Sequence, residues 1–190
     1  MKDIIFEKVS KYADVDLPLP TRSTTSSAGY DFIVAEDVVL KPYEHITTKL
    51  RDGVALSDYW GFNRPLTLDE VSLATKDLRA RPQLISTGMK CKMPKNVYLQ
   101  LNVRSSTPLK HWIILANSVG IIDADYYNNP DNEGEIFMQV INLAPFAIQL
   151  KRGDKIGQGI FHTYELTEND SANGERLGGF GSTDGNNSMS

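Results

Sequence analysis

Alternating apolar and polar residues are the dominant pattern along this chain. In "VYLQLNV" (97–103) and "IFMQVIN" (136–142) apolar residues recur at every second position, which is the period of a strand with one buried face. Similar runs rich in Val, Ile, Tyr and Phe are separated by turn residues such as Pro42, Pro145 and Gly153. Many short strands joined by turns predict an all-β fold of the sandwich, jelly-roll or barrel type.

The alternation stops over residues 45–84, which read as an inserted segment. In "LTLDEVSLATKDLRAR" Thr67 can cap a helix, and Glu70 three positions later completes a capping box. In such a helix Val71, Ala74 and Leu78 would lie on one apolar face. The pattern predicts a short helix between Pro65 and Pro82. Two roles stay open for the segment, a packing element or a docking surface for another protein or subunit.

Length and charge narrow the functional classes. A chain of 190 residues with 41% hydrophobic and 23% charged residues is typical of one globular domain. A net charge of -4 argues against direct nucleic-acid binding, which needs a basic surface. A local basic pocket for a phosphate ligand remains compatible with this charge.

The start of the chain and its single cysteine predict a cytoplasmic protein without membrane contact. "MKDIIFEKVSKYAD" mixes acidic with apolar residues and lacks the apolar core of a signal peptide. No stretch reaches the ~20 apolar residues of a membrane-spanning helix. Cys91 has no second cysteine to pair with, which suits a reducing compartment, and its alternation with Met89 and Met93 predicts a packing role.

The end of the chain changes in composition. Residues 168–190 are rich in Gly, Ser and Asn, which predicts a flexible C-terminal arm. Within it, "GGFGST" (178–183) has the groups that an anionic ligand needs. Glycine lets backbone N–H groups approach an anion, Ser and Thr add hydroxyl donors, and the Phe ring can cover a flat ligand.

An apolar stretch, "ILANSVGIIDADYY", breaks for the carboxylate of Asp123. Taken locally, the residue is either a turn aspartate at the end of a strand or a general base held in a pocket. No Ser–His or Cys–His pair that would supply a protein nucleophile is evident. His45, His111, His162 and Cys91 are scattered without the spacing of zinc ligands.

Five short pieces follow one another along the chain: "AGYDF" (28–32), "RSS" (104–106), "NSVGIIDADYY" (117–127), "RGDKIGQ" (152–158) and "GGFGST" (178–183). Asn117 follows Arg104 by thirteen positions, and Asp123 follows Asn117 by six. In order and spacing these pieces resemble the motifs of the trimeric dUTPases (dUTP diphosphatases), including phage and Gram-positive members with extra segments.

The resemblance implies one dUTPase domain over residues 1–190 with a jelly-roll-like (β-clip) fold. It implies a homotrimer whose subunits share their active sites, with the C-terminal arm closing over the substrate. The implied reaction is Mg²⁺-assisted hydrolysis of dUTP to dUMP and pyrophosphate. Such an enzyme keeps uracil out of DNA and supplies dUMP for thymidylate synthesis, in the cytosol of a bacterium or of a phage-infected host.

The same resemblance assigns roles to individual residues. Asp123 would activate the attacking water, and Asp31 would contact magnesium through water, since magnesium held by phosphates keeps several waters. Tyr126 would lie against the deoxyribose and exclude a 2′-hydroxyl. The uridine site would comprise Asn117, Gly120, Ile121, Ile122, Tyr126 and Phe180. The phosphate site would comprise Arg104, Ser105, Ser106, Gln158, Arg176, Ser182 and Thr183.

Three departures from the family pattern are visible. Glu175 stands where the family has an arginine, and Arg176 lies one position closer to the motif-five Phe. We expect Arg176 to reach the γ-phosphate through a shifted loop. The short family turn "DYxGE" is expanded by six residues around 128–133, at the expected rim of the site. The third departure is the 45–84 insertion.

Two alternative functions follow from the residues. A dCTP deaminase, or a bifunctional deaminase and dUTPase, shares the fold but needs a glutamate where this chain has Gln139, and glutamine is no general base. The other alternative is a dUTPase with an additional regulatory role, in which a protein partner binds the 45–84 segment.

Overall fold

The computed structural model describes residues 3–43 and 82–179. In this part of the chain short strands dominate. The helices there are one α-helix, α4 (Ser106–His111), and two 3-10 turns, η1 (Ser10–Tyr12) and η2 (Ala124–Tyr126). The all-β class predicted from the alternation is confirmed. The strands are β1 (Ile5–Lys8), β2 (Thr21–Arg22), β3 (Tyr30–Ile33), β4 (Val38–Leu40), β5 (Gln83–Ser86), β6 (Met89–Lys92), β7 (Val97–Asn102), β8 (Ile113–Leu115), β9 (Gly120–Ile122), β10 (Phe137–Asn142), β11 (Ile148–Leu150) and β12 (Lys155–Thr163).

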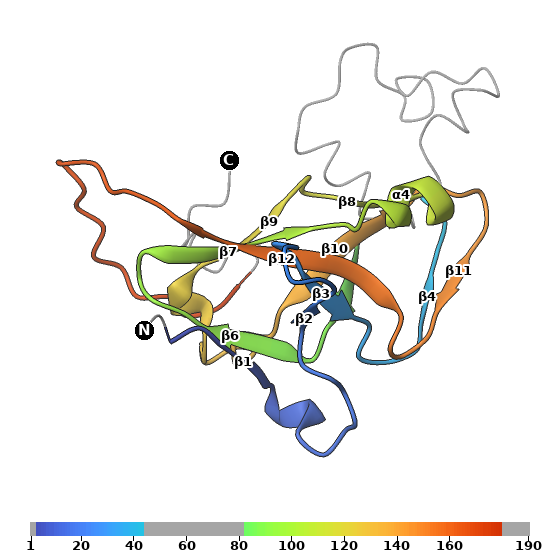
Figure 1. The fold of residues 1–190 in the computed structure, drawn as a ribbon, viewed down its shortest axis with the longest axis horizontal. Coiled ribbons are helices and arrows are strands. Elements are labelled where there is room, and N and C mark those ends of the chain that lie inside the picture. Colours follow the sequence, from blue (N-terminus) through green and yellow to red (C-terminus); the bar gives the residue numbers. More distant parts are fainter. Residues whose placement is uncertain (1–2, 44–81, 180–190) are drawn as a thin grey trace, which may run out of the picture.

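The largest sheet has five strands in the order β2-β3-β12-β7-β9, and all neighbours are antiparallel. β12 crosses its middle as the long orange strand of Figure 1. Its register sets Gln158 opposite Asp31 on one side and opposite Asn102 on the other. Two of the motifs predicted from the sequence are therefore neighbours across this sheet.

A second sheet, β5-β10-β8, forms the other main part of the fold. Along β10, Met138 and Val140 are buried while Phe137 and Gln139 are partly exposed, as the alternation of "IFMQVIN" predicts. Two smaller antiparallel pairs, β1-β6 and β4-β11, complete the sheets. The strands thus place one face of each sheet in a shared interior.

The core lies between these sheets and is built from aliphatic and aromatic side chains. Phe32, Leu99 and Met138 are at most 1% exposed. Cys91 is buried among them, and burial raises the pKa of its thiol to about 12. A thiol with so high a pKa is inert at neutral pH, which agrees with the packing role expected for it.

Helix α4 (Ser106–His111) was not expected from the sequence. Its six residues contain Pro108 in the first turn, where proline is tolerated, and they are too few to show a helical period. Trp112 closes the helix in the left-handed conformation, with φ at 55°. The helix predicted between Pro65 and Pro82 lies outside the described residues.

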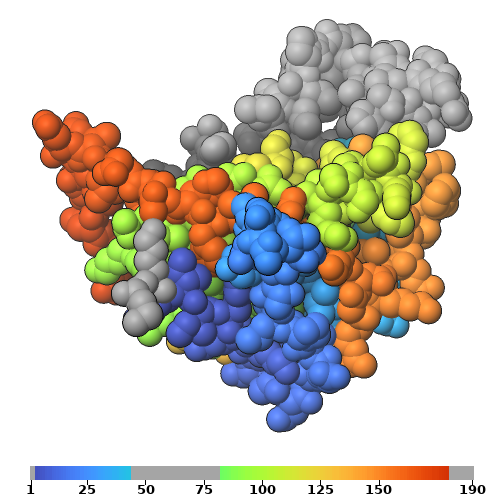
Figure 2. All heavy atoms as spheres, viewed as in Figure 1, coloured from blue at the N-terminus to red at the C-terminus, as the bar shows by residue number. Residues whose placement is uncertain are grey.

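The inserted segment and the arm are described only in part. Gln83 and Leu84, the last residues of the 45–84 segment, belong to β5 and pair with β10. After β12 the chain projects from the body as a long exposed loop and then returns toward η2 (Figures 1 and 2). Within the described ranges no helix is long and apolar enough to cross a bilayer.

Candidate active site

A pocket opens where β9, the turn η2 (Ala124–Tyr126), β10 and the returning arm meet. Six of the residues predicted to bind uridine or to act on the water lie in its wall, together with Arg176 from the predicted phosphate group. The lining consists of Leu101, Asn117, Gly120, Ile121, Ile122, Asp123, Tyr126, Phe137, Gln139, Arg176 and Gly179.

Strand β9 reaches this wall because its first residue is a glycine. Gly120 pairs with Leu101 of β7, and a Cβ at Gly120 would lie only 3.2 Å from the Leu101 Cβ. Before it, Asn117 and Ser118 make a tight turn, with Ser118 at a φ of 62°. The turn places the Asn117 amide, with its donor and its acceptor, at the mouth of the pocket.

Asp123 stands at the junction of β9 and η2. It has an extended backbone, and its carbonyl accepts a hydrogen bond from the Tyr126 N–H at 3.1 Å, which closes the turn. The strand therefore ends with the Asp123 carboxylate in the pocket lining. Asp123 is therefore both the residue that begins this turn and part of the pocket lining.

The pKa of the Asp123 carboxyl is raised above its ordinary value. Burial raises it most, the charge of Arg176 lowers it, and the charge of Asp125 raises it again. Arg176 Nη2 lies 2.5 Å from Asp123 Oδ2, and Arg176 Nε lies 2.7 Å from Asp125 Oδ1. The guanidinium of Arg176, on the arm, thus forms ion pairs with the carboxylates of both Asp123 and Asp125.

Tyr126 forms the floor of the pocket and is 6% exposed. Its hydroxyl donates to the Glu135 carbonyl at 3.0 Å and accepts from Asn132 Nδ2 at 2.7 Å. The Arg176 guanidinium carbon lies 5.8 Å from the centre of the Tyr126 ring. Gly179 passes so close that a Cβ there would be 2.9 Å from a ring carbon.

A second polar cluster surrounds Asp31 on β3. Asp31 accepts from Lys155 Nζ and from Ser23 Oγ, each at 2.7 Å, and pairs with Arg104 Nε at 3.1 Å. Burial raises the pKa of Asp31, but the hydrogen bonds from Lys155 and Ser23 and the charge of Arg104 outweigh it, so the pKa is lowered. Asp31 is therefore an ionised carboxylate at neutral pH.

Of the predicted phosphate residues, Arg104 and Gln158 lie at this second cluster, whereas Arg176 lines the Asp123 pocket. Arg104 and Ser106 line a separate hollow next to Lys155, and Gln158 lies opposite Asp31 in the sheet. Ser105 directly precedes helix α4 and is exposed. Phe180, Ser182 and Thr183 lie outside the described residues. Within one chain, then, Arg104 and Ser106 line a different hollow from the predicted uridine residues, while Arg176 shares the hollow of Asp123.

No dense metal cage appears in the part of the chain that the structure describes. No group of three His, Cys, Asp or Glu residues there is arranged to hold an ion. Asp31 is the one predicted metal contact, and its oxygens already face Lys155, Ser23 and Arg104. This donor set fits a magnesium ion carried by substrate phosphates and touched through water, since magnesium retains much of its hydration shell.

Several pocket residues were not assigned a binding role from the sequence. Leu101, Phe137 and Gln139 enter the lining through β7 and β10, and Gly179 enters through the arm. The period of β10 does identify Phe137 and Gln139 as sharing one face. That this face meets Asp123 depends on sheet pairing, which a single sequence does not reveal.

A family model and a curated relative both connect this chain with the dUTPases. The sequence model of the dUTPase family matches residues 72–184. The deoxyuridine 5'-triphosphate nucleotidohydrolase of Lactococcus lactis subsp. lactis (strain IL1403) is 36% identical over 180 residues, which is 94% of this chain and 95% of the relative.

Solved structures agree. The crystal structure of dUTPase from Streptococcus mutans is 34% identical, with a TM-score of 0.64 over 86% of this chain and 98% of that one. A dUTPase from phage phi11 of S. aureus, whose structure details the coordination of a structural Mg(II) ion, covers 89% of this chain and 95% of its own. At 17% identity and a TM-score of 0.57, this second likeness concerns the fold alone.

Proposed function

The chain belongs to the dUTPase family and is a hydrolase of dUTP, and we propose that the Asp123 pocket is where it binds the nucleoside and activates water. The observation that carries this proposal is the shared wall of the pocket. One carboxylate, one amide and one buried aromatic ring, those of Asp123, Asn117 and Tyr126, line the same hollow.

Asp123 acts as the general base in this proposal. Hydrolysis of a phosphoanhydride needs a positioned water, a group that takes its proton and stabilisation of the phosphate charge. The pKa of Asp123 is raised toward neutral pH, which makes its carboxylate a stronger base. The water attacks phosphorus and loses a proton to Asp123 as the bond to pyrophosphate breaks.

Asn117 and the backbone of residues 120–122 read the uracil edge. An amide has both a donor and an acceptor, so it can pair with the carbonyl and the N–H of uracil, while cytosine would leave buried groups unpaired. Tyr126 lies against the deoxyribose and leaves no room for a 2′-hydroxyl. Phe180 then covers the uracil ring.

Phosphate binding is assigned to the second cluster, supplied by a neighbouring subunit of a homotrimer. Arg104, Ser105, Ser106 and Gln158 provide a guanidinium, hydroxyls and an amide, with Arg176, Ser182 and Thr183 added by the arm. The separation of the two hollows within one chain supports an active site shared between subunits. Asp31 would hold Mg²⁺ through water, and the ion would neutralise charge on the phosphates.

Gln139 supports hydrolysis over deamination. The residue lines the same pocket as Asp123, at the position where a deaminase of this fold needs a glutamate, and its amide cannot take a proton from water. A dUTPase with an additional role, in which a regulatory protein binds the 45–84 segment, stays the alternative. Since dUTP is a soluble nucleotide, the cytosol is the proposed location.

The proposal is tested by pyrophosphate release from purified protein with Mg²⁺, using dUTP, dCTP, dTTP and UTP, and by the variant Asp123→Asn. We expect turnover of dUTP alone and its loss in the variant. Full activity of Asp123→Asn would refute the assignment of the base. Conversion of dCTP to a deaminated product would move the protein to the alternative function despite Gln139.

A further inference from the structure

The loop between η2 and β10 is longer than the family turn that the sequence resembles, and it is tightly organised. Asn128 N–H donates to the Glu133 carbonyl at 3.0 Å, and Glu133 N–H donates to the Asn129 carbonyl at 3.0 Å. Asn128 and Glu133 both have left-handed backbones, with φ of 58° and 59°. These bonds close the neck of the loop and give it one shape.

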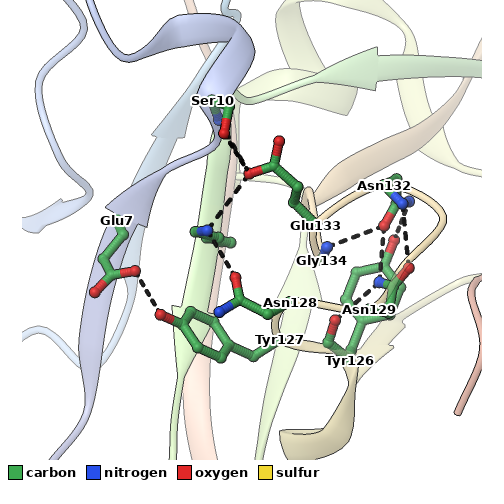
Figure 3. Close-up of polar contacts among 10 residues, drawn as sticks. Glu7, Ser10, Tyr126, Tyr127, Asn128, Asn129, Asn132, Glu133 and Gly134 are labelled. Carbon is green, nitrogen blue, oxygen red and sulfur yellow. Dashed lines mark hydrogen bonds and ion pairs between the residues drawn. The ribbon is translucent and has the colours of Figure 1, made fainter.

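Inside the loop both the oxygen and the nitrogen of the Asn132 amide make hydrogen bonds, as Figure 3 shows. Its Oδ1 accepts from Asn129 Nδ2 at 2.8 Å and from the Gly134 N–H at 3.0 Å. Its Nδ2 donates to the Tyr126 hydroxyl at 2.7 Å. The two loop bonds fix the amide plane, so the donor that faces Tyr126 is held in one direction.

The loop grips both ends of Tyr126. At the hydroxyl, Asn132 donates a hydrogen bond and the Glu135 carbonyl accepts one. These two bonds fix the orientation of the O–H group. At the backbone, Asn129 Nδ2 donates to the Tyr126 carbonyl at 2.9 Å. Gly134 passes over this carbonyl with a φ of 80°, and a Cβ there would lie 2.5 Å from the oxygen.

The outer side of the loop is attached to the N-terminal part of the chain. Glu133 accepts from Ser10 Oγ at 2.9 Å, and Lys90 Nζ donates to Asn128 Oδ1 at 2.7 Å. The neighbouring Tyr127 hydroxyl donates to Glu7 Oε2 at 2.6 Å (Figure 3). The loop is therefore a bridge between the β1-β6 pair and the floor of the pocket.

We propose that Asn132 is a positioning residue that holds the Tyr126 ring against the sugar, so that the expanded loop sets how well the enzyme discriminates dUTP from UTP. This inference rests on the proposed role of Tyr126 in excluding a 2′-hydroxyl. A steric wall rejects a ligand only if it does not move, and a site whose supporting groups are loose by ~1 Å loses much of its selectivity.

The test compares kcat/KM for UTP with kcat/KM for dUTP. Asn132→Ala should raise the UTP-to-dUTP ratio by about tenfold, the value of one lost hydrogen bond. Tyr126→Phe, which lacks the hydroxyl, should raise it by a similar factor. The double variant should show a rise smaller than the product of the two single rises, because both changes remove the bond between Asn132 and Tyr126.

Asn128→Gly is the matched control. It lies in the same loop and keeps the left-handed backbone at no steric cost. The change removes side-chain contacts with Lys90 and Tyr127 but none with Tyr126. Its substrate ratio should equal that of the wild type even if its melting temperature falls. An equal rise in Asn128→Gly and Asn132→Ala would show a general loosening of the loop and overturn the specific role of Asn132.

A second readout separates this inference from the proposed function. NMR of isotope-labelled tyrosine rings should show altered Tyr126 resonances or faster ring flips in Asn132→Ala. Unchanged Tyr126 resonances would overturn the positioning role. If Tyr126→Ala leaves the UTP-to-dUTP ratio unchanged, the claim that the loop sets discrimination falls with the proposed role of Tyr126, and changed resonances in Asn132→Ala would still support the positioning of the ring.

Discussion

At the scale of single residues, the charge of Arg176 should control the pH dependence of the reaction. The base must be deprotonated, so activity falls as the pH drops through the raised pKa of Asp123. Arg176→Gln removes the cation that lowers this pKa. The acid limb of the kcat/KM profile should therefore move to higher pH, which a pH series of initial rates measures.

Lys92→Gln provides the charge-matched control for this experiment, because Lys92 is exposed on β6 and does not line the pocket. Its acid limb should coincide with that of the wild type. Arg176→Gln will also bind phosphates less well, so the position of the limb, not the height of the profile, is the readout. A limb that moves to lower pH would contradict the electrostatic role of Arg176.

Glu135 gives a second prediction at this scale, on stability. The side chain is 8% exposed, and burial raises its pKa although hydrogen bonds from Ser86 and the Gly88 N–H lower it. A carboxyl with a folded pKa above its unfolded value favours folding when protonated, so its ionisation destabilises the fold as pH rises. Glu135→Gln should be more thermostable than the wild type, by a margin that grows as the pH rises above about 4, the ordinary pKa of a glutamic acid.

Thermal melts of both proteins over a series of pH values measure the margin. Glutamine removes the charge and keeps only one of the two oxygens that can accept from Ser86 and the Gly88 N–H. At the acid end both proteins carry a neutral side chain, so the difference there measures the changed hydrogen bonds, and its growth with pH measures the ionisation. A difference in melting temperature that stays constant with pH would mean that ionisation of Glu135 has no part in it.

At the scale of elements, the packing around β12 makes Gly159 intolerant of a side chain. A Cβ there would lie 2.7 Å from Leu99 Cδ1 and 2.8 Å from Phe32 Cε2, both in fully packed core positions. Gly159→Ala should lower the free energy of unfolding by about 1–3 kcal/mol, the range for overpacked cores. Denaturant unfolding of the variant and of Gly174→Ala, which meets no atom within 4 Å, checks this.

Elements with a clear period were predictable, and contacts between elements were not. The burial of β10 follows directly from "IFMQVIN", because each second side chain faces the core. Helix α4 is too short to show any period. The bond from Asn132 to Tyr126 depends on the left-handed backbones of Asn128 and Glu133. A left-handed backbone is predictable from the sequence mainly at glycine, and neither residue is a glycine.

The site was predictable to the same extent. Asp123 and Tyr126 lie within four residues of one another, so their motif already places them together. Arg176 reaches Asp123 from 53 residues away, through a loop that projects from the body and returns. Nothing in the local sequence around Arg176 indicates that path, and the resemblance to a family suggested only a phosphate for it.

At the scale of the whole molecule, the two hollows of one chain make a prediction about assembly. If Asp123 of one subunit works with Arg104 of another, two inactive variants can complement each other. Subunits of Asp123→Asn and Arg104→Gln, unfolded, mixed in equal amounts and refolded together, should form trimers in which about a quarter of the sites carry both native residues. Pyrophosphate release should then recover in proportion, while each variant refolded alone stays inactive.

Asn117 supplies the control for this mixing experiment, because it lines the same pocket as Asp123. A mixture of Asp123→Asn with Asn117→Ala should give no recovery, since each native pocket needs both residues from one chain. Recovery in the first mixture and none in the second would establish that the nucleoside and phosphate groups come from different subunits. No recovery in either, with trimers present by light scattering, would mean that the Asp31 cluster and the Asp123 pocket serve the same substrate within one chain, or that Arg104 acts only on Asp31.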